Sequence, residues 1–251
     1  MSDITPELLE QIRLAQKKPQ PIEDTSPEKP ALSQTPDPSL VVHEIKNHDG
    51  KVIQKIPLKN GVIDGILEVF DEKGNLRQSI PYENNLTQGT MMGYDDLGNI
   101  LYEIPFKDGK KEGLGTFYMN GTKSSDITFQ NDQMDGSFTA YHGNGAISMQ
   151  VTYKESHMDG ELSAFNERGT LVKKETYAMG KKNGPSQTFY PSGNLYEEAT
   201  FENNIPINQS TTYHENQKPM TIKHYKEGKI VLTETYDDNG GLKKKEAGTN
   251  G

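Results

Sequence analysis

Residues 141–165 read YHGNGAISMQVTYKESHMDGELSAF, and this stretch decides the fold because the chain repeats its pattern every 24 residues. A turn residue, nearly always glycine, marks each copy, and the steps between turns are 24 residues with two exceptions of 23. The turn positions are Gly50, Gly74, Gly98, Gly121, Gly145, Gly169, Gly193, Gln217 and Gly240. A fixed period of this length indicates a repeat architecture in which each unit packs mainly on its neighbours.

Two series of large side chains keep the phase of the turns. The first lies four residues before each turn: Phe70, Tyr94, Phe117, Tyr141, Phe165, Phe189, Tyr213 and Tyr236. The second lies eight residues after each turn: Leu58, Tyr82, Phe106, Phe129, Tyr153, Tyr177, Phe201 and Tyr225. We expect the two series to share one aromatic face of a sheet.

Within each copy, apolar residues alternate with polar ones, as in the run Ile147, Met149, Val151 and Tyr153. Such alternation predicts half-buried β-strands, and the glycines supply the positive φ of hairpin turns. Proline recurs in one phase, at Pro57, Pro81 and Pro105, and predicts interrupted strand pairing on one side of those strands. The predicted fold is all-β: an elongated single-layer antiparallel meander of about eight 24-residue β-hairpin repeats, with a short N-terminal helix.

The chain divides into four regions. Residues 1–18 predict an amphipathic helix that starts at Pro6 and carries Leu8, Leu9 and Ile12 on one face. Residues 19–39 contain six prolines and predict a disordered linker. The repeat array occupies residues 40–242, and residues 243–251 predict a disordered tail.

The composition narrows the function. A hydrophobic content of 31% favours a thin array over a thick globular core. The net charge of −9 argues against nucleic acid as a partner and suits a basic protein. The chain has no cysteine, no signal-peptide core and no apolar stretch of the ~20 residues that a membrane span needs. We therefore expect a cytoplasmic protein without disulfides.

The repeat resembles MORN-like repeats, and it is similar to the bacterial YwqK-type antitoxin family. Three groups of residues carry the resemblance: Tyr141-His-Gly-Asn-Gly145 with Tyr153 and Met158-Asp-Gly160, Phe189-Tyr-Pro-Ser-Gly193 with Phe201, and Tyr225-Lys-Glu-Gly228. The resemblance extends over the array. It implies a protein that binds and neutralises a partner protein, and it offers no catalytic motif.

A further row of residues, seven positions before each turn, is the candidate partner-binding site. Its apolar members are Leu67, Met91, Leu114, Phe138 and Leu162. Ser186, Ser210 and Thr233 follow, so the array has an apolar half and a polar half. We expect the row on the face opposite the aromatic series. It either forms a groove for a partner or for the chain's own N-terminal helix, or packs against neighbouring turns.

No residues form a recognisable catalytic, metal or cofactor site. Only His142 and His214 share a repeat phase, and they lie three units apart, too far for common metal ligation. We therefore expect a non-enzymatic protein without metal or cofactor. The first hypothesis is an antitoxin or immunity-like protein that occludes a toxin. The alternative is an adaptor or chaperone that holds an effector for a bacterial secretion system.

Overall fold

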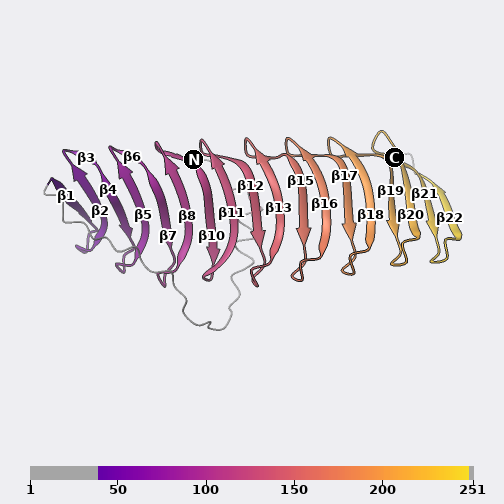
Figure 1. The fold of residues 1–251 in the computed structure, drawn as a ribbon, viewed down its shortest axis with the longest axis horizontal. Helices are drawn as coiled ribbons and strands as arrows, with labels where there is room; N and C mark the ends of the chain where they lie inside the picture. The colour runs from indigo at the N-terminus through magenta and orange to yellow at the C-terminus, as the bar shows by residue number, and fades with distance from the viewer. Residues whose placement is uncertain (1–38, 249–251) are drawn as a thin grey trace.

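The computed structural model describes residues 39–248 and shows one open antiparallel sheet of 22 strands (Figure 1). Successive strands of the chain lie side by side along the long axis, and the free edges are β1 and β22. The predicted all-β meander is confirmed. The helix expected over residues 1–18, and all but the last residue of the linker, lie outside the described residues.

Four strands are two-residue segments that precede a bulge, and the other 18 form nine hairpins. In order they are β1 (Leu40–Lys46), β2 (Val52–Lys59), β3 (Val62–Ile63), β4 (Gly65–Phe70), β5 (Leu76–Glu83), β6 (Leu86–Thr87), β7 (Gly89–Tyr94), β8 (Ile100–Lys107), β9 (Lys110–Lys111), β10 (Gly113–Met119), β11 (Thr122–Gln130), β12 (Gln133–Tyr141), β13 (Ile147–Lys154), β14 (His157–Met158), β15 (Gly160–Phe165), β16 (Leu171–Ala178), β17 (Lys181–Phe189), β18 (Leu195–Glu202), β19 (Ile205–Tyr213), β20 (Pro219–Lys226), β21 (Lys229–Tyr236) and β22 (Leu242–Ala247).

Two kinds of turn alternate along the sheet. The short turns have two central residues, both with positive φ, as in Asn131 (48°) and Asp132 (70°). Such turns match the twist of the flanking strands. In the longer turns the His142 amide donates to the Ala146 carbonyl at 2.8 Å, and the Gly145 amide donates to the His142 carbonyl at 2.9 Å. Together the two turns and two strands make up the 24-residue period.

A bulge interrupts the strand pairing near each of the eight short turns, and near the first seven a proline or threonine lies across from it. The Asp64 amide donates to the Pro57 carbonyl at 3.1 Å, outside the regular ladder. Gly136 has a φ of +119°, and a Cβ there would lie 2.9 Å from Thr128. The interruption predicted from the proline phase is confirmed. The positive φ favours glycine at these bulges, and at Gly136 an added side chain would also clash, whereas Asn208 takes the seventh position with a φ of 59°.

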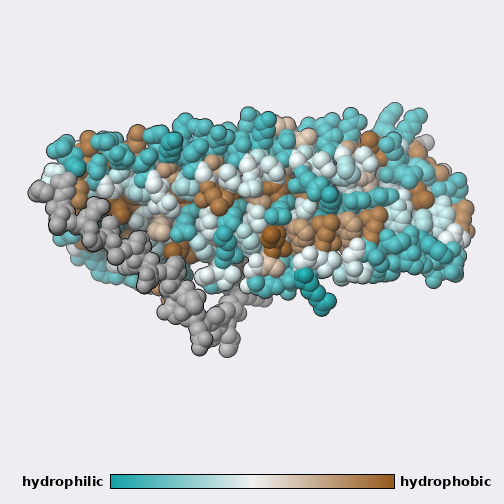
Figure 2. Space-filling view, viewed as in Figure 1, coloured by the Kyte–Doolittle hydropathy of each residue, from teal (hydrophilic) through white to brown (hydrophobic). Residues whose placement is uncertain are grey.

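One face of the sheet holds the hydrophobic core. Phe138 lies directly opposite Ile127 on one side and Val151 on the other, so the three side chains form a row across the strands. The buried apolar residues are Ile104, Ile127, Phe129, Phe138, Val151 and Leu162. We call this side the core face and the other side the back face. In the view of Figure 2, apolar residues gather mostly along the middle of the array, between hydrophilic margins.

The two aromatic series lie on opposite faces, which corrects the expectation of a single aromatic face. Tyr153 packs edge-on against Phe138 on the core face, with ring centroids 6.0 Å apart. The Tyr141 hydroxyl instead donates to Asp126 on the back face at 2.7 Å. The cause is a bulge beside each long turn, where Ser148 is an extra residue in the ladder and reverses the alternation.

The core-face row turns polar in the C-terminal half. It continues through Glu175, Ser186, Ala199, Ser210, Lys223 and Thr233. Glu175 is only 2% exposed and accepts bonds from Lys182 at 2.5 Å and from the Tyr177 hydroxyl at 2.9 Å, with Lys173 3.1 Å away. Burial opposes ionisation, but these donors outweigh it and lower the pKa of Glu175. The carboxylate therefore stays charged inside the sheet.

The sheet extends past its predicted end. β22 includes Lys243 to Ala247, which were expected in a disordered tail, and pairs with β21 along its length. Lys245 lies 2.8 Å from Glu234 on that neighbouring strand. The lysine run therefore forms an edge strand, because its alternate residues continue the pairing of the last hairpin.

The bulge glycines predict a first measurement. Gly136→Ala should lower the free energy of unfolding by about 1–3 kcal/mol, because alanine rarely adopts this φ and its Cβ would press on Thr128. Gly143→Ala is the matched control, since an added Cβ there meets nothing within 4 Å, and it should change stability by less than about 0.5 kcal/mol. Urea denaturation of both variants measures the difference, and equal losses would contradict it.

Glu175 predicts a pH dependence. Its folded-state pKa is lowered from 4.5, so its contribution is present above that value and is lost as pH falls toward the folded pKa. Glu175→Gln should therefore destabilise the protein at pH 7, and the gap to the wild type should narrow below about pH 4.5. Melting curves across pH 3–7 measure the gap, with exposed Glu161→Gln as control. A gap that is independent of pH would show that the charge of Glu175 does not contribute.

Candidate partner-binding surface

The structure places the predicted partner-binding row, except Leu114, on the core face of the sheet. Leu67, Met91 and Phe138 lie directly opposite Ile80, Ile104 and Val151. Leu162 lies opposite Glu175 in the same way. The row is therefore interleaved with the isoleucine series on the core face, instead of lying on the opposite face. Phe138 is only 4% exposed and Leu162 is also buried, while Leu67 and Met91 are half-buried.

Leu114 is the exception in that row. It pairs with Thr128, lies on the back face and is 53% exposed, while Gly115 takes the core position opposite Ile127. The turn at Gly121 is one residue shorter than the other long turns, so counting seven residues back reaches the wrong face. For the same reason Tyr118, and not Phe117, is the back-face aromatic of this repeat.

Leu114 belongs to a row of apolar residues on the back face. In this row Val42 pairs with Pro57, Ile66 with Pro81, and Leu114 with Thr128. We define the apolar stripe as Val42, Pro57, Ile66, Pro81, Pro105 and Leu114. Val42 and Ile66 are 51% and 45% exposed, so these large apolar side chains face solvent.

The stripe ends at the middle of the array. Beyond Leu114 the same positions hold Thr128, Ser137, Thr152, Glu161 and Thr176. The sequence contained two signals for the stripe, the recurrent proline phase and the apolar residues Ile66 and Leu114 directly after the bulge glycines Gly65 and Gly113. Neither could be placed on a face without knowledge of the bulges.

Tyrosines paired with carboxylates run beside the stripe on the back face. The Tyr118 hydroxyl donates to Glu103 at 2.9 Å, and Glu103 lies two residues from Pro105 on β8. Asp126 accepts bonds from the hydroxyls of Tyr141 at 2.7 Å and Thr116 at 2.9 Å. We call Glu103, Tyr118, Asp126 and Tyr141 the acidic column.

One carboxylate of the acidic column, Asp126, remains ionised at neutral pH. Burial opposes ionisation of Asp126, but Lys123, Tyr141 and Thr116 donate to it and lower its pKa. The hydrogen bond to Asp126 and burial raise the pKa of Tyr141 to about 12. Burial and the bond to Glu103 likewise raise the pKa of Tyr118 to about 12. Next to the apolar stripe, the column therefore holds an ionised Asp126 that is buried and paired with Lys123, and two tyrosine hydroxyls that stay neutral.

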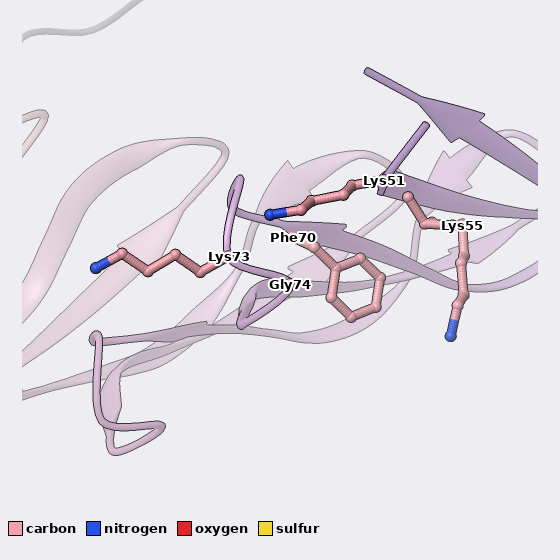
Figure 3. Close-up of a pocket in the computed structure, with 6 residues that line it drawn as sticks. Lys51, Lys55, Phe70, Lys73 and Gly74 are labelled. Carbon is pink, nitrogen blue, oxygen red and sulfur yellow. The ribbon is translucent and has the colours of Figure 1, made fainter. Parts of the chain in front are cut away.

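A hollow of about 390 Å³ near β2 and β4 is lined by Lys51, Lys55, Phe70 and Lys73 (Figure 3). The three ammonium groups do not converge on a common point in Figure 3. Lys51 donates to the Glu72 carbonyl at 2.9 Å, and Lys55 lies 3.5 Å from Glu68. Lys51 and Lys55 therefore contact neighbouring segments of the sheet, and the three lysines do not form a converging anion site.

Within residues 39–248, no three histidine, aspartate or glutamate side chains gather as metal ligands do. The same part of the chain has no helix of the length and apolarity that a membrane span requires. What the described geometry does offer is an extended surface, with the apolar stripe and the acidic column side by side.

Comparison with known proteins agrees with this architecture. The family model described as a MORN repeat variant matches residues 63–84, 87–108 and 182–203, so the chain contains repeats of this type. A search of curated proteins gave no match. A solved structure described as "Crystal Structure of TcdB2-TccC3-Cdc42" is similar at 12% identity and a TM-score of 0.16. That match covers 80% of this chain but 14% of the other, and it supports no conclusion about fold or function.

The different positions of Phe138 and Leu114 predict that the same substitution has different effects on stability at the two sites. Phe138→Asp should destabilise or unfold the array, because it buries an unpaired carboxylate in the core face. Leu114→Asp should change the free energy of unfolding by less than about 0.5 kcal/mol, because that side chain faces solvent. Circular dichroism during urea unfolding measures both variants. If Phe138→Asp kept wild-type stability, the core assignment would be wrong.

Proposed function

We propose that this chain is a non-catalytic protein-binding repeat protein whose back face holds a protein partner. The observation that carries the proposal is the apolar stripe beside the acidic column, in which Val42, Ile66 and Leu114 are exposed and the prolines are buried or half-buried. Interfaces commonly combine an apolar centre with a polar, hydrogen-bonding rim. The MORN-variant repeats support this reading, since they build an extended surface from a repeated unit.

The dimensions of the surface suit a folded partner. The stripe extends over seven neighbouring main strands, from β1 to β10, with Thr90 at its position on β7, and strands lie about 4.8 Å apart, which gives a length of about 30 Å. A standard interface covers roughly 800 Å² on each partner. A partner on the stripe would therefore also reach the acidic column.

The charge of the surface favours a basic partner. Glu103 lies half-buried at the edge of the stripe, and the whole chain carries a net charge of −9, whereas Asp126 is only 9% exposed and its carboxylate is already paired with Lys123. Complementary charge speeds association and selects partners more than it tightens the complex. We propose an antitoxin or immunity-like protein in the cytoplasm that neutralises a basic toxin by covering its active surface.

Capture of the partner from the native host, followed by calorimetry with the purified partner, tests the proposal. Ile66→Asp and Leu114→Asp should each weaken binding at least tenfold, because each places a charge in the apolar centre. Ile205→Asp is the matched control, since Ile205 is 50% exposed but lies in the C-terminal half. Loss of the partner's toxicity on binding would support the antitoxin reading.

Other outcomes would change the proposal. A secreted effector whose activity survives binding would favour the adaptor or chaperone alternative. If all three variants bound the partner as tightly as the wild type, the stripe would not be the binding surface.

A further inference from the structure

The first strand of the sheet is an exposed edge of unusual composition. β1 reads LVVHEIK, and Leu40, Val41, Val42 and Ile45 are all exposed. In the described part of the chain β1 pairs with β2 alone, so its other side presents a row of backbone groups without a neighbouring strand. Natural proteins usually protect such edges with charge, because an apolar edge pairs readily with another strand.

The geometry of Pro57 identifies which groups of β1 point outward. The Pro57 carbonyl accepts a bond from Asp64, so it faces β3 and β4 and turns away from β1. Val42 lies opposite Pro57, and residues opposite each other in an antiparallel pair exchange either both bonds or neither. The N–H and C=O of Val42 therefore point to the free edge. By alternation, those of Leu40 and Glu44 do the same.

The other edge of the sheet is protected. β22 reads LKKKEA and carries Lys243, Lys244 and Lys245 along its length. Lysine on an edge strand opposes pairing with another strand, and two β22 edges would repel each other. The two ends of the array therefore differ, and the apolar β1 end is suited to accept a strand.

We propose that β1 pairs with β1 of a second copy of this chain, antiparallel and about a two-fold axis through Val42. In this register Val42 faces its own copy, and Leu40 faces Glu44 of the other chain. All six outward N–H and C=O groups of Leu40, Val42 and Glu44 then find partners. The sequence of β1 is thus self-complementary in its backbone, as a closed two-fold interface requires.

The side chains agree with this register. A two-fold axis normal to the sheet keeps the core faces of both copies on one side. Val41 then lies opposite His43 of the other copy, and the exposed Val42 side chains pack on each other on the back face. The apolar halves of both arrays meet at the centre, and their polar halves lie at the outer ends. The two apolar stripes become one continuous stripe across the axis.

The chain has no cysteine, so a single introduced thiol tests the register. Val42→Cys should form an intermolecular disulfide under mild oxidation, because hydrogen-bonded antiparallel pairs have Cα atoms about 5.5 Å apart, within the disulfide range. Leu40→Cys is the matched control on the same edge. In this register Leu40 faces Glu44 of the other chain, so the two introduced thiols would lie about four residues apart along the strand. Lys244→Cys is the control for the opposite edge.

The mass of the full chain in solution gives the second readout. Light scattering should show a wild-type species of twice the 28.0 kDa chain mass. Val42→Pro should give the monomer with an unchanged melting curve, because it removes an outward donor and no bond to β2. If Val42→Pro unfolds, Val42→Lys replaces it in the measurement and should also give the monomer.

Three results would overturn the proposal. One is a monomeric wild type together with slow cross-linking of all three cysteine variants. Another is faster cross-linking of Leu40→Cys than of Val42→Cys, which would exclude the register. The third is faster cross-linking of Lys244→Cys, which would place the contact at the other edge.

Discussion

A sheet one layer thick has no second layer to cover its side chains, and this constraint shapes the whole array. Each central side chain must be buried by its neighbours on the adjacent strands. Phe138 is buried between Ile127 and Val151, and Tyr153 closes over it. The 24-residue period follows, because every repeat must place its large residue at the same point of this row. The bulge glycines keep that alignment where the strands twist and bend.

The same constraint divides the array into regions with different roles. The core-face row is apolar up to Leu162 and becomes polar at Glu175, whose buried charge requires two lysines and a tyrosine. A buried ion pair contributes less to stability than apolar packing of the same volume. The middle of the array therefore supplies most of the stability. Since the core face is occupied by this packing in the N-terminal half, the back face is free to carry the apolar stripe and the acidic column.

The repeat, the strands, the turns and the all-β architecture could be predicted from the sequence, because glycine, aromatic residues and alternation mark them in every copy. The assignment of residues to faces could not. One extra residue, such as Ser148, reverses the alternation between a turn and the next strand, and nothing in its chemistry marks it as extra. Because the turn at Gly121 is shorter, counting seven residues back from each turn put Leu114, which is exposed, in one row with residues that the structure places on the core face. Leu114 is the one member of the predicted row that belongs to the apolar stripe. The sequence indicated the rest of the stripe mainly through the recurrent prolines.

Amide hydrogen exchange along the intact chain tests the central claim most directly, that a row of cross-strand contacts on the core face holds the array together. Exchange reports the free energy of local opening, which is highest where packing is densest. The account predicts the slowest exchange in β11 to β13, around Ile127, Phe138 and Val151, with faster exchange toward both β1 and β22. Uniform protection along the sheet, or the slowest exchange beyond Glu175, would contradict it.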